Sequence, residues 1–205
     1  DDMNPSARRG RQIAGAAAVA LAVGLLAMGI AAAGDEPKED DAEDGAYVQF
    51  SKEHPLGEVR SDRALVYVLR PTSMGFAIKS FFLCDDEILG INKGSSYFFA
   101  HVAPGKRVFW SKSENVDALE LEVEAGKTYY IQQRVQMGGF RARTKLEVLD
   151  EAAGKKALEK CDRHATMTPR GVEKGKEIAR EHKGATQKDL ERRAKKEREE
   201  ESEAD

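Results

Sequence analysis

Residues 119–136 read LELEVEAGKTYYIQQRVQ and carry the clearest structural signal in the chain. The first part alternates apolar residues with glutamates, which is the period-two pattern of a strand with one buried and one solvated face. Gly126 and Lys127 interrupt the pattern, and Thr128–Gln136 continues as a second run rich in aromatic and β-branched residues. The stretch therefore predicts two strands joined by a tight turn.

Similar short runs lie on both sides of this stretch, roughly every ten residues, and Gly, Pro or Asp residues separate them. Residues 150–163 then switch to helical spacing, with Ala153, Ala157 and Leu158 on one face. We predict a mainly β domain, an antiparallel β-sandwich of about seven strands of the immunoglobulin-like or transthyretin-like kind, followed by a short helix. The other predicted strands are residues 64–70, 78–84, 88–91, 96–102, 107–112 and 143–149.

Composition divides the chain into four segments. Residues 1–34 are a signal peptide or a single transmembrane anchor, and residues 35–60 are an acidic flexible linker, in which 47–60 add an extended segment packed loosely on the domain. The acidic part lacks the large apolar residues that could offset the entropy of ordering. Residues 61–163 are the β-sandwich with its helix, and 164–205 are a charged tail, helical or disordered.

The N-terminal segment contains an uninterrupted apolar run, Ile13–Ala33. As a helix its 21 residues would measure about 31 Å, which matches the hydrocarbon core of a bilayer. Three arginines precede the run and seven acidic residues follow it within twelve positions, so the N-terminus is expected to stay in the cytoplasm. We therefore expect export across the inner membrane, with the domain periplasmic or anchored to that membrane.

Cleavage and retention of this run are both open. Ala31 and Ala33 supply the small residues that signal peptidase requires before a cut, so the predicted cleavage site is Ala33–Gly34. Retention would leave a hydrophobic N-terminal helix as a membrane anchor. A buried core helix is the third, less favoured interpretation.

Two cysteines, Cys84 and Cys161, fall within the predicted domain. An oxidising compartment would allow a disulfide that ties the helix to the sandwich. Two separately buried thiols are the alternative.

Aromatic and basic residues suggest a ligand or partner face, for which the candidates are Trp110, Tyr129, Arg134, Arg141 and Arg143. The arginines surround one hairpin and would suit an anionic partner. Because neighbours in a strand point to opposite faces, about half of the aromatic residues must be core. The exposed half would include either Trp110 or its neighbour Phe109. A solvated strand face over an aromatic core is the alternative.

Motifs for catalysis are weak. Gly126-Lys127-Thr128 lacks the glycine that a phosphate-binding loop needs five residues earlier, because position 121 is leucine. Three adjacent acids, 85–87, suit a hairpin turn, and the four histidines lack metal-binding spacing. The net charge of −3 does not favour binding to nucleic acid. We expect no enzymatic activity, no metal and no cofactor.

Three stretches together resemble a family of bacterial envelope domains of unknown function, whose members are small β-sandwich modules and often lipoproteins. They are VYVLRP (66–71), LCDDEILGINKGSSYFFAHVAPGKRVFW (83–110) and LEVEAGKTYYIQ (121–132). The sequence is also loosely similar to PEGA-type and transthyretin-like sandwiches. The resemblance implies the fold and the compartment and assigns no catalytic residue. The acylated cysteine of the lipoprotein pattern is missing here.

The sequence thus favours an exported, non-enzymatic interaction module of the cell envelope. The expected partners are an envelope protein or a cell-wall polymer, and the membrane itself if the N-terminal helix is uncleaved. The alternative is a small-ligand or carbohydrate-binding envelope protein that uses an exposed aromatic face.

Overall fold

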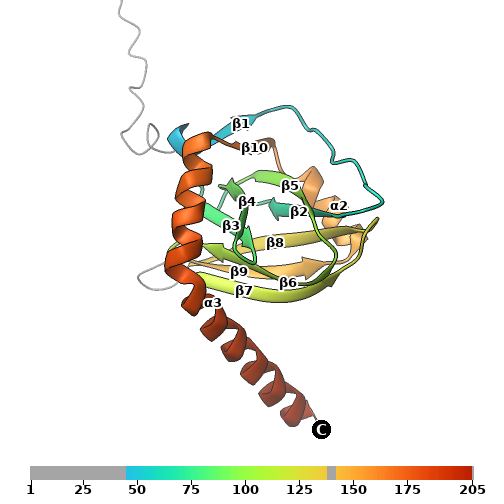
Figure 1. Ribbon diagram of the computed structural model, residues 1–205, viewed down its shortest axis with the longest axis vertical. Coiled ribbons are helices and arrows are strands. Elements are labelled where there is room, and N and C mark those ends of the chain that lie inside the picture. Colours follow the sequence, from blue (N-terminus) through green and yellow to red (C-terminus); the bar gives the residue numbers. More distant parts are fainter. Residues whose placement is uncertain (1–44, 138–141, 205) are drawn as a thin grey trace, which may run out of the picture. The chain divides into compact units, whose positions relative to one another are not determined.

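The computed structural model describes residues 45–137 and 142–204. Within these ranges the chain forms ten strands and two helices (Figure 1). In chain order they are β1 (Val48–Ser51), β2 (Ala64–Arg70), β3 (Ser80–Cys84), β4 (Glu87–Asn92), β5 (Ser96–Val102), β6 (Gly105–Lys112), β7 (Val116–Val123), β8 (Thr128–Met137), β9 (Ala142–Leu149), α2 (Glu151–Glu159), β10 (Arg163–Met167) and α3 (Pro169–Ala204).

The strands form two sheets. Sheet A has six strands in the order β1-β10-β5-β2-β8-β9, and sheet B has four in the order β4-β3-β6-β7. The sheets pack face to face through aromatic contacts, such as the edge-to-face pair of Phe82 in sheet B with Phe98 in sheet A. The prediction of a mainly β domain is confirmed, and the predicted N-terminal hydrophobic helix lies outside the described residues.

The predicted topology was wrong in two respects. The described chain has ten strands instead of about seven, and the sandwich is not wholly antiparallel, because β2 pairs with β8 and β5 with β10 in parallel. Both parallel partners are distant in sequence, since the chain leaves sheet A for sheet B between them. Side-chain alternation reports which face of a strand is buried and carries no information on the direction of its neighbour.

The domain boundaries also differ from those predicted. β1 lies inside the segment predicted as linker, and β10 crosses the predicted boundary at 163/164. The two strands pair with each other antiparallel at the edge of sheet A. Thr168 links the end of β10 to the residues before β1. Its Oγ1 donates to the Ala46 carbonyl over 2.5 Å, and its N–H donates to the Tyr47 carbonyl over 3.1 Å. Neither strand has a partner nearby in sequence, so local patterns could not reveal the pairing.

Strand β2 is buried on both faces along its whole length. Val66 and Val68 point between the sheets and belong to the main hydrophobic core. Leu65, Tyr67 and Leu69 point to the other face and form a second cluster. A strand of this kind needs a covering layer on the outer side of its own sheet as well as the facing sheet.

Helix α2 and the segment 52–63 supply that outer layer over sheet A. Gly154 of α2 lies so close to the Tyr130 ring that an added Cβ would come within 2.2 Å of it. The segment 52–63 is tied down by the Tyr67 hydroxyl, which accepts from the Gly57 N–H over 2.8 Å. The Asp150 side chain begins α2 by accepting from the Ala153 N–H, as an N-cap aspartate does.

Helix α3 covers the outer face of sheet B. Ile178 and Ala179 are buried in the main core, and Val172 and Leu190 pack against it. The predicted charged tail is therefore a helix after Pro169, and its first half is part of the packed domain. After Arg193 the helix carries ion pairs of its own, such as Lys195 with Glu199, and it extends beyond the sandwich (Figure 1).

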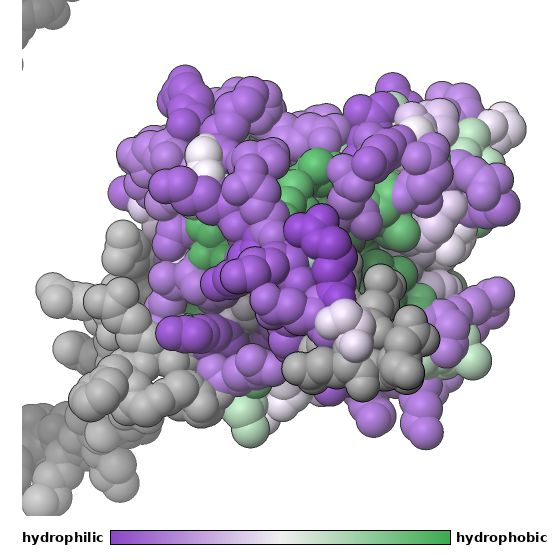
Figure 2. All heavy atoms as spheres, turned by 90° about the horizontal axis from the view of Figure 1, so that it is seen from below, coloured by the Kyte–Doolittle hydropathy of each residue, from purple (hydrophilic) through white to green (hydrophobic). Residues whose placement is uncertain are grey.

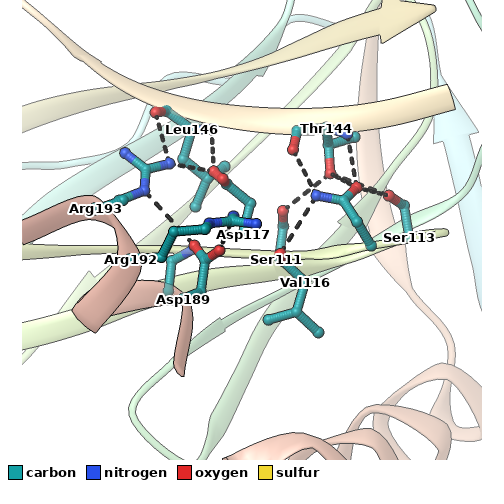
Figure 3. Close-up of polar contacts among 11 residues, drawn as sticks. Ser111, Ser113, Val116, Asp117, Thr144, Leu146, Asp189, Arg192 and Arg193 are labelled. Carbon is teal, nitrogen blue, oxygen red and sulfur yellow. Dashed lines mark hydrogen bonds and ion pairs between the residues drawn. The ribbon is translucent and has the colours of Figure 1, made fainter. Parts of the chain in front are cut away.

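Side chains join the free edges of the two sheets at β7 and β9 (Figure 3). The Asp117 carboxylate accepts from the Leu146 N–H over 2.6 Å. The Asn115 side chain both accepts from the Thr144 N–H over 2.8 Å and donates to the Thr144 carbonyl over 2.9 Å. These bonds take the place of a strand-to-strand ladder and satisfy backbone groups that an edge strand leaves unpaired.

Helix α3 adds a charged hydrogen bond and ion pairs at the same edge (Figure 3). The Asp189 carboxylate accepts from the Ala118 N–H over 2.8 Å, and Arg193 forms an ion pair with Asp117. Asp189 and Asp117 are both buried, with 6% of each residue exposed. Arg193 Nε also lies 3.7 Å from Asp189 Oδ2, so one guanidinium neutralises two buried carboxylates, and its removal would leave Asp117 without a counter-charge inside the protein.

We therefore expect Asp117→Ala to destabilise the domain strongly. The variant leaves the buried Leu146 N–H without its acceptor and removes one of the two carboxylates beside Arg193, which keeps Asp189, at a cost of about 2 kcal/mol. Urea unfolding followed by tryptophan fluorescence measures this, since the chain has one tryptophan. Glu173→Ala is the matched control, because Glu173 forms an exposed helical ion pair with Lys176, and its urea midpoint should equal that of the native protein. Equal midpoints for both variants would contradict the proposed role of Asp117.

Candidate functional site

A pocket of about 440 Å³ lies between helix α3 and the outer face of sheet B. The β3–β4 turn and strand β6 form one side of it, and one face of α3 forms the other. The side chains have mixed character, with an indole, two aliphatic groups, a hydroxyl, an amide, two carboxylates and an ammonium. The lining residues are Asp85, Asp86, Val108, Trp110, Lys183, Gly184, Thr186, Gln187 and Leu190.

Asp85 holds the sheet side of the pocket in place. Its φ of 52° is the left-handed conformation that aspartate tolerates in a tight turn. The Asp85 carboxylate accepts from the Val108 N–H over 3.0 Å and from Arg107 over 3.1 Å, and its carbonyl accepts from the Trp110 indole N–H over 2.7 Å. The turn is therefore fixed to β6, and the Trp110 indole of β6 is held against the turn, before any ligand binds.

The helix side is joined to the turn by one ion pair. Lys183 Nζ lies 2.8 Å from Asp86 Oδ2, and both side chains are exposed. A Cβ added at Gly184 would meet no atom within 4 Å, so the helix leaves open space at that position. The Gln187 amide lies one helical turn further along and interacts with Glu191 on the same helix.

The polar groups of the pocket are already engaged within the protein. Asp85 and Asp86 make the hydrogen bonds and the ion pair just described, and the Thr186 hydroxyl donates to the His182 carbonyl over 3.2 Å. Within residues 45–137 and 142–204 there is also no cluster of three or more His, Cys, Asp or Glu side chains able to hold a metal ion. An indole beside polar groups is typical of sites for small amphipathic ligands.

The structure does not bring the predicted ligand face together. Trp110 is 2% exposed beneath α3, and Tyr129 is half-buried on the inner side of sheet A with its hydroxyl accepting from the Glu124 N–H. Arg134 and Arg143 are exposed, with Arg134 paired to Glu147, and Arg141 lies outside the described residues.

The expected exposed aromatic surface was also wrong. Phe109 and Trp110 are both buried, because each face of sheet B is covered by another layer. The face seen in Figure 2 is mainly hydrophilic; strongly hydrophobic residues show in hollows between polar side chains, and weakly hydrophobic ones at the edges. A strand pattern cannot reveal that a distant helix covers the second face of a sheet.

Of the two alternatives left open for the cysteines, the disulfide does not form. Cys84 and Cys161 are free, buried thiols, Cys84 in the main core and Cys161 in the cluster beneath α2. Burial raises the pKa of each thiol to about 12, and Asp85 adds to this effect at Cys84. The alternative of two separately buried cysteines describes the structure.

The tight turn predicted at Gly126 and Lys127 is confirmed, since Gly126 has a φ of 77° and lies between β7 and β8. The turn is not a hairpin, because β7 belongs to sheet B and β8 to sheet A. The acidic residues 85–87 form the β3–β4 turn and the start of β4.

The residues on the helix side of the pocket were not predicted from the sequence. Lys183, Thr186, Gln187 and Leu190 follow the spacing i, i+3, i+4, i+7, which places them on one face of a helix. Only one of the four is apolar, so the pattern resembled a solvated helix. A search for mixed polar and apolar stripes at this spacing would have found them.

The described residues contain no helix that is both long and apolar enough to cross a membrane. The run Ile13–Ala33 and the predicted cleavage site at Ala33 and Gly34 lie outside them.

Comparison with known proteins places the similarity in the strands. Residues 60–145 match a family described as a protein of unknown function (DUF2846). An uncharacterized protein of Haemophilus influenzae is 32% identical over 99 residues, which make up 47% of this chain and 58% of that protein, so the chain spans less than two thirds of this relative. No solved structure matches. These findings support the predicted resemblance to a domain family of unknown function, and they do not confirm the PEGA-type or transthyretin-like likeness.

The matched range contains the β3–β4 turn and β6, and it ends before α3. The sheet side of the pocket therefore lies inside the region of similarity, and its helix side lies outside.

We expect both thiols to be present and unreactive in the native protein. At pH 8 a thiol with a pKa near 12 is almost wholly protonated, and burial also blocks the reagent. Ellman's reagent should label neither cysteine in the folded protein and both in guanidinium chloride without a reductant. Labelling that appears only after reduction would show that the two cysteines are bonded.

Proposed function

We propose that the protein is an exported, non-enzymatic interaction module of the bacterial cell envelope, and that its partner is an envelope protein. The observation that carries the export is the order of basic residues, apolar run and acidic spacer before residue 45. The proposal of an interaction module is based on a two-sheet domain whose described residues form a pocket and no recognisable set of catalytic side chains.

The contact to the partner is made by the end of α3, residues 194–204, here named the helical arm. Its sequence, AKKEREEESEA, has no large apolar residue, so the arm cannot be stabilised by packing on its own domain. A helix that is polar all round is held by ion pairs or by contact with another structure. The mixed charges of the arm suit a partner surface with complementary charges better than an anionic polymer.

Photocrosslinking in living bacteria tests the location and the contact together. A photoreactive amino acid replaces Arg198 in the arm, and in the matched control it replaces Lys127, which lies exposed in the β7–β8 turn. We expect an adduct with an envelope protein from position 198 only, and we expect external protease to degrade that adduct in spheroplasts.

An adduct that resists protease until the inner membrane is lysed would contradict export. Absence of any adduct at position 198, together with a monomeric protein in envelope extracts, would contradict the role of the arm.

A second candidate function is the binding of a small ligand, and the pocket beside Trp110 favours it. The ligand would place an apolar group on the indole and polar groups against Thr186 and Gln187. This version of the ligand-binding hypothesis needs no exposed aromatic face.

A thermal-shift screen with peptidoglycan disaccharide and short glycans tests this candidate. Gln187→Leu should abolish the shift that a true ligand produces, because it removes a polar group that lines the pocket. Gln132→Leu, on sheet A and outside the pocket, should leave the shift unchanged. A shift that survives in Gln187→Leu would place the ligand elsewhere.

A further inference from the structure

The space between the two sheets is polar at one end. Most of the interior is apolar, yet at the end where β2 and β4 finish and β3 and β5 begin, the buried side chains are charged, amide or hydroxyl groups. All are less than 3% exposed: Arg70, Ser80, Asn92, Ser96, Ser111, Gln133 and Thr144.

Strand pairing places four of these residues in two adjacent pairs, one in each sheet, and we name Arg70, Ser80, Asn92 and Gln133 the polar cluster. Ser80 and Asn92 are directly opposite each other in sheet B. In sheet A, Leu69 is paired with Gln132, so the next residues along, Arg70 and Gln133, are neighbours on adjacent parallel strands. The short connections between β2 and β3 and between β4 and β5 close the same end of both sheets.

The polar cluster is not satisfied by the protein. Six side-chain atoms in it are buried and have no hydrogen-bond partner among the described residues: Arg70 Nε, Ser80 Oγ, both amide atoms of Asn92 and both of Gln133. The other polar residues at this end do have partners, since Ser111 is bonded to Thr144 and Ser96 to the backbone of Lys93. Proteins rarely leave so many buried groups unpaired without a bound species to engage them.

Arg70 gives the cluster its charge. Its guanidinium donates to the carbonyls of Ile78 over 2.6 Å and of Gly75 over 2.7 Å, and no described carboxylate forms an ion pair with it. Burial lowers the pKa of Arg70 to about 10, so the group remains a cation at neutral pH. A fully buried cation without a counter-charge is costly, and an anion beside it would offset that cost.

The loop 71–79 covers this end. Gly75 has a φ of 63°, and a Cβ at that position would lie 3.3 Å from the Arg70 guanidinium, so the loop passes directly over the cluster. Met74 and Phe76 in the same loop are more than half exposed. The loop is therefore fastened to the cluster by Arg70 and has few packed side chains of its own to hold it closed.

We propose that the polar cluster binds a small oxyanion, a carboxylate or a phosphate group. The Nε–H of Arg70, the amide NH₂ groups of Asn92 and Gln133, and the Ser80 hydroxyl are its donors. These donors come from both sheets, so the anion would join the sheets at the end that lacks apolar packing. This site is separate from the pocket beside Trp110 and does not depend on the function proposed above.

NMR of the full chain labelled with ¹⁵N-arginine tests the site directly, because the unpaired donor is the Arg70 Nε–H. Sodium acetate and inorganic phosphate are titrated separately at constant ionic strength. We expect a saturable shift of the Arg70 Nε–H signal with at least one of them. Saturation by phosphate alone assigns a phosphate group, and saturation by acetate assigns a carboxylate.

Two interior variants separate binding from folding. Gln133→Leu removes an amide that has no protein partner, so it should keep or raise the melting temperature and abolish the saturable shift. Thr144→Val is the matched control at the same end, because it removes a hydroxyl bonded to Ser111 and Ser113. It should lower the melting temperature and keep the shift.

Three results would overturn the proposal. One is a linear, unsaturable response of the Arg70 signal to both anions in the native protein. Another is a saturable shift that persists in Gln133→Leu. The last is a water molecule that contacts the Arg70 Nε–H throughout the titration, since the cluster would then be satisfied by solvent.

Discussion

The burial of β2 on both of its faces is the constraint on which the other layers depend. Val66 and Val68 on one side need a facing sheet, and Leu65, Tyr67 and Leu69 on the other need a cover. Sheet B meets the first need, and α2 with the segment 52–63 meets the second. The chain must leave sheet A twice to build sheet B. As a result β2 lies between an antiparallel neighbour, β5, and a parallel neighbour, β8.

The same layering explains where binding can occur. Sheet B buries its aromatic residues on both faces, so Trp110 contributes the floor of a pocket under α3 instead of an exposed platform. Between the sheets, apolar packing fills one end and the polar cluster occupies the other. The domain thus has two polar regions of different chemistry, an amphipathic pocket under α3 and a buried cluster around the Arg70 cation.

Closure of the sandwich relies on side chains where the backbone cannot pair. Asn115, just before β7, and Asp117 of β7 bond to the backbone of β9, and Asp189 of α3 bonds to the backbone of β7. These contacts couple α3 to both sheets. A partner that pulls on the helical arm would therefore act on the edge of the sandwich as well, because Arg193 immediately precedes the arm and pairs with Asp117.

The sequence by itself determined the strand positions from residue 64 to 149, the turns at Asp85 and Gly126 and the short helix after Asp150, because alternation, turn chemistry and helical spacing are local properties. Only the tertiary structure decided that β1 pairs with β10, that two strand pairs are parallel and that α3 covers sheet B. The candidate sites belong to this second group. Either Trp110 or Phe109 was expected to be exposed, Arg70 was correctly placed at the end of a strand but its burial was not predicted, and the pairing of Cys84 with Cys161 was left open, since the environment of each side chain depends on residues that are distant in sequence.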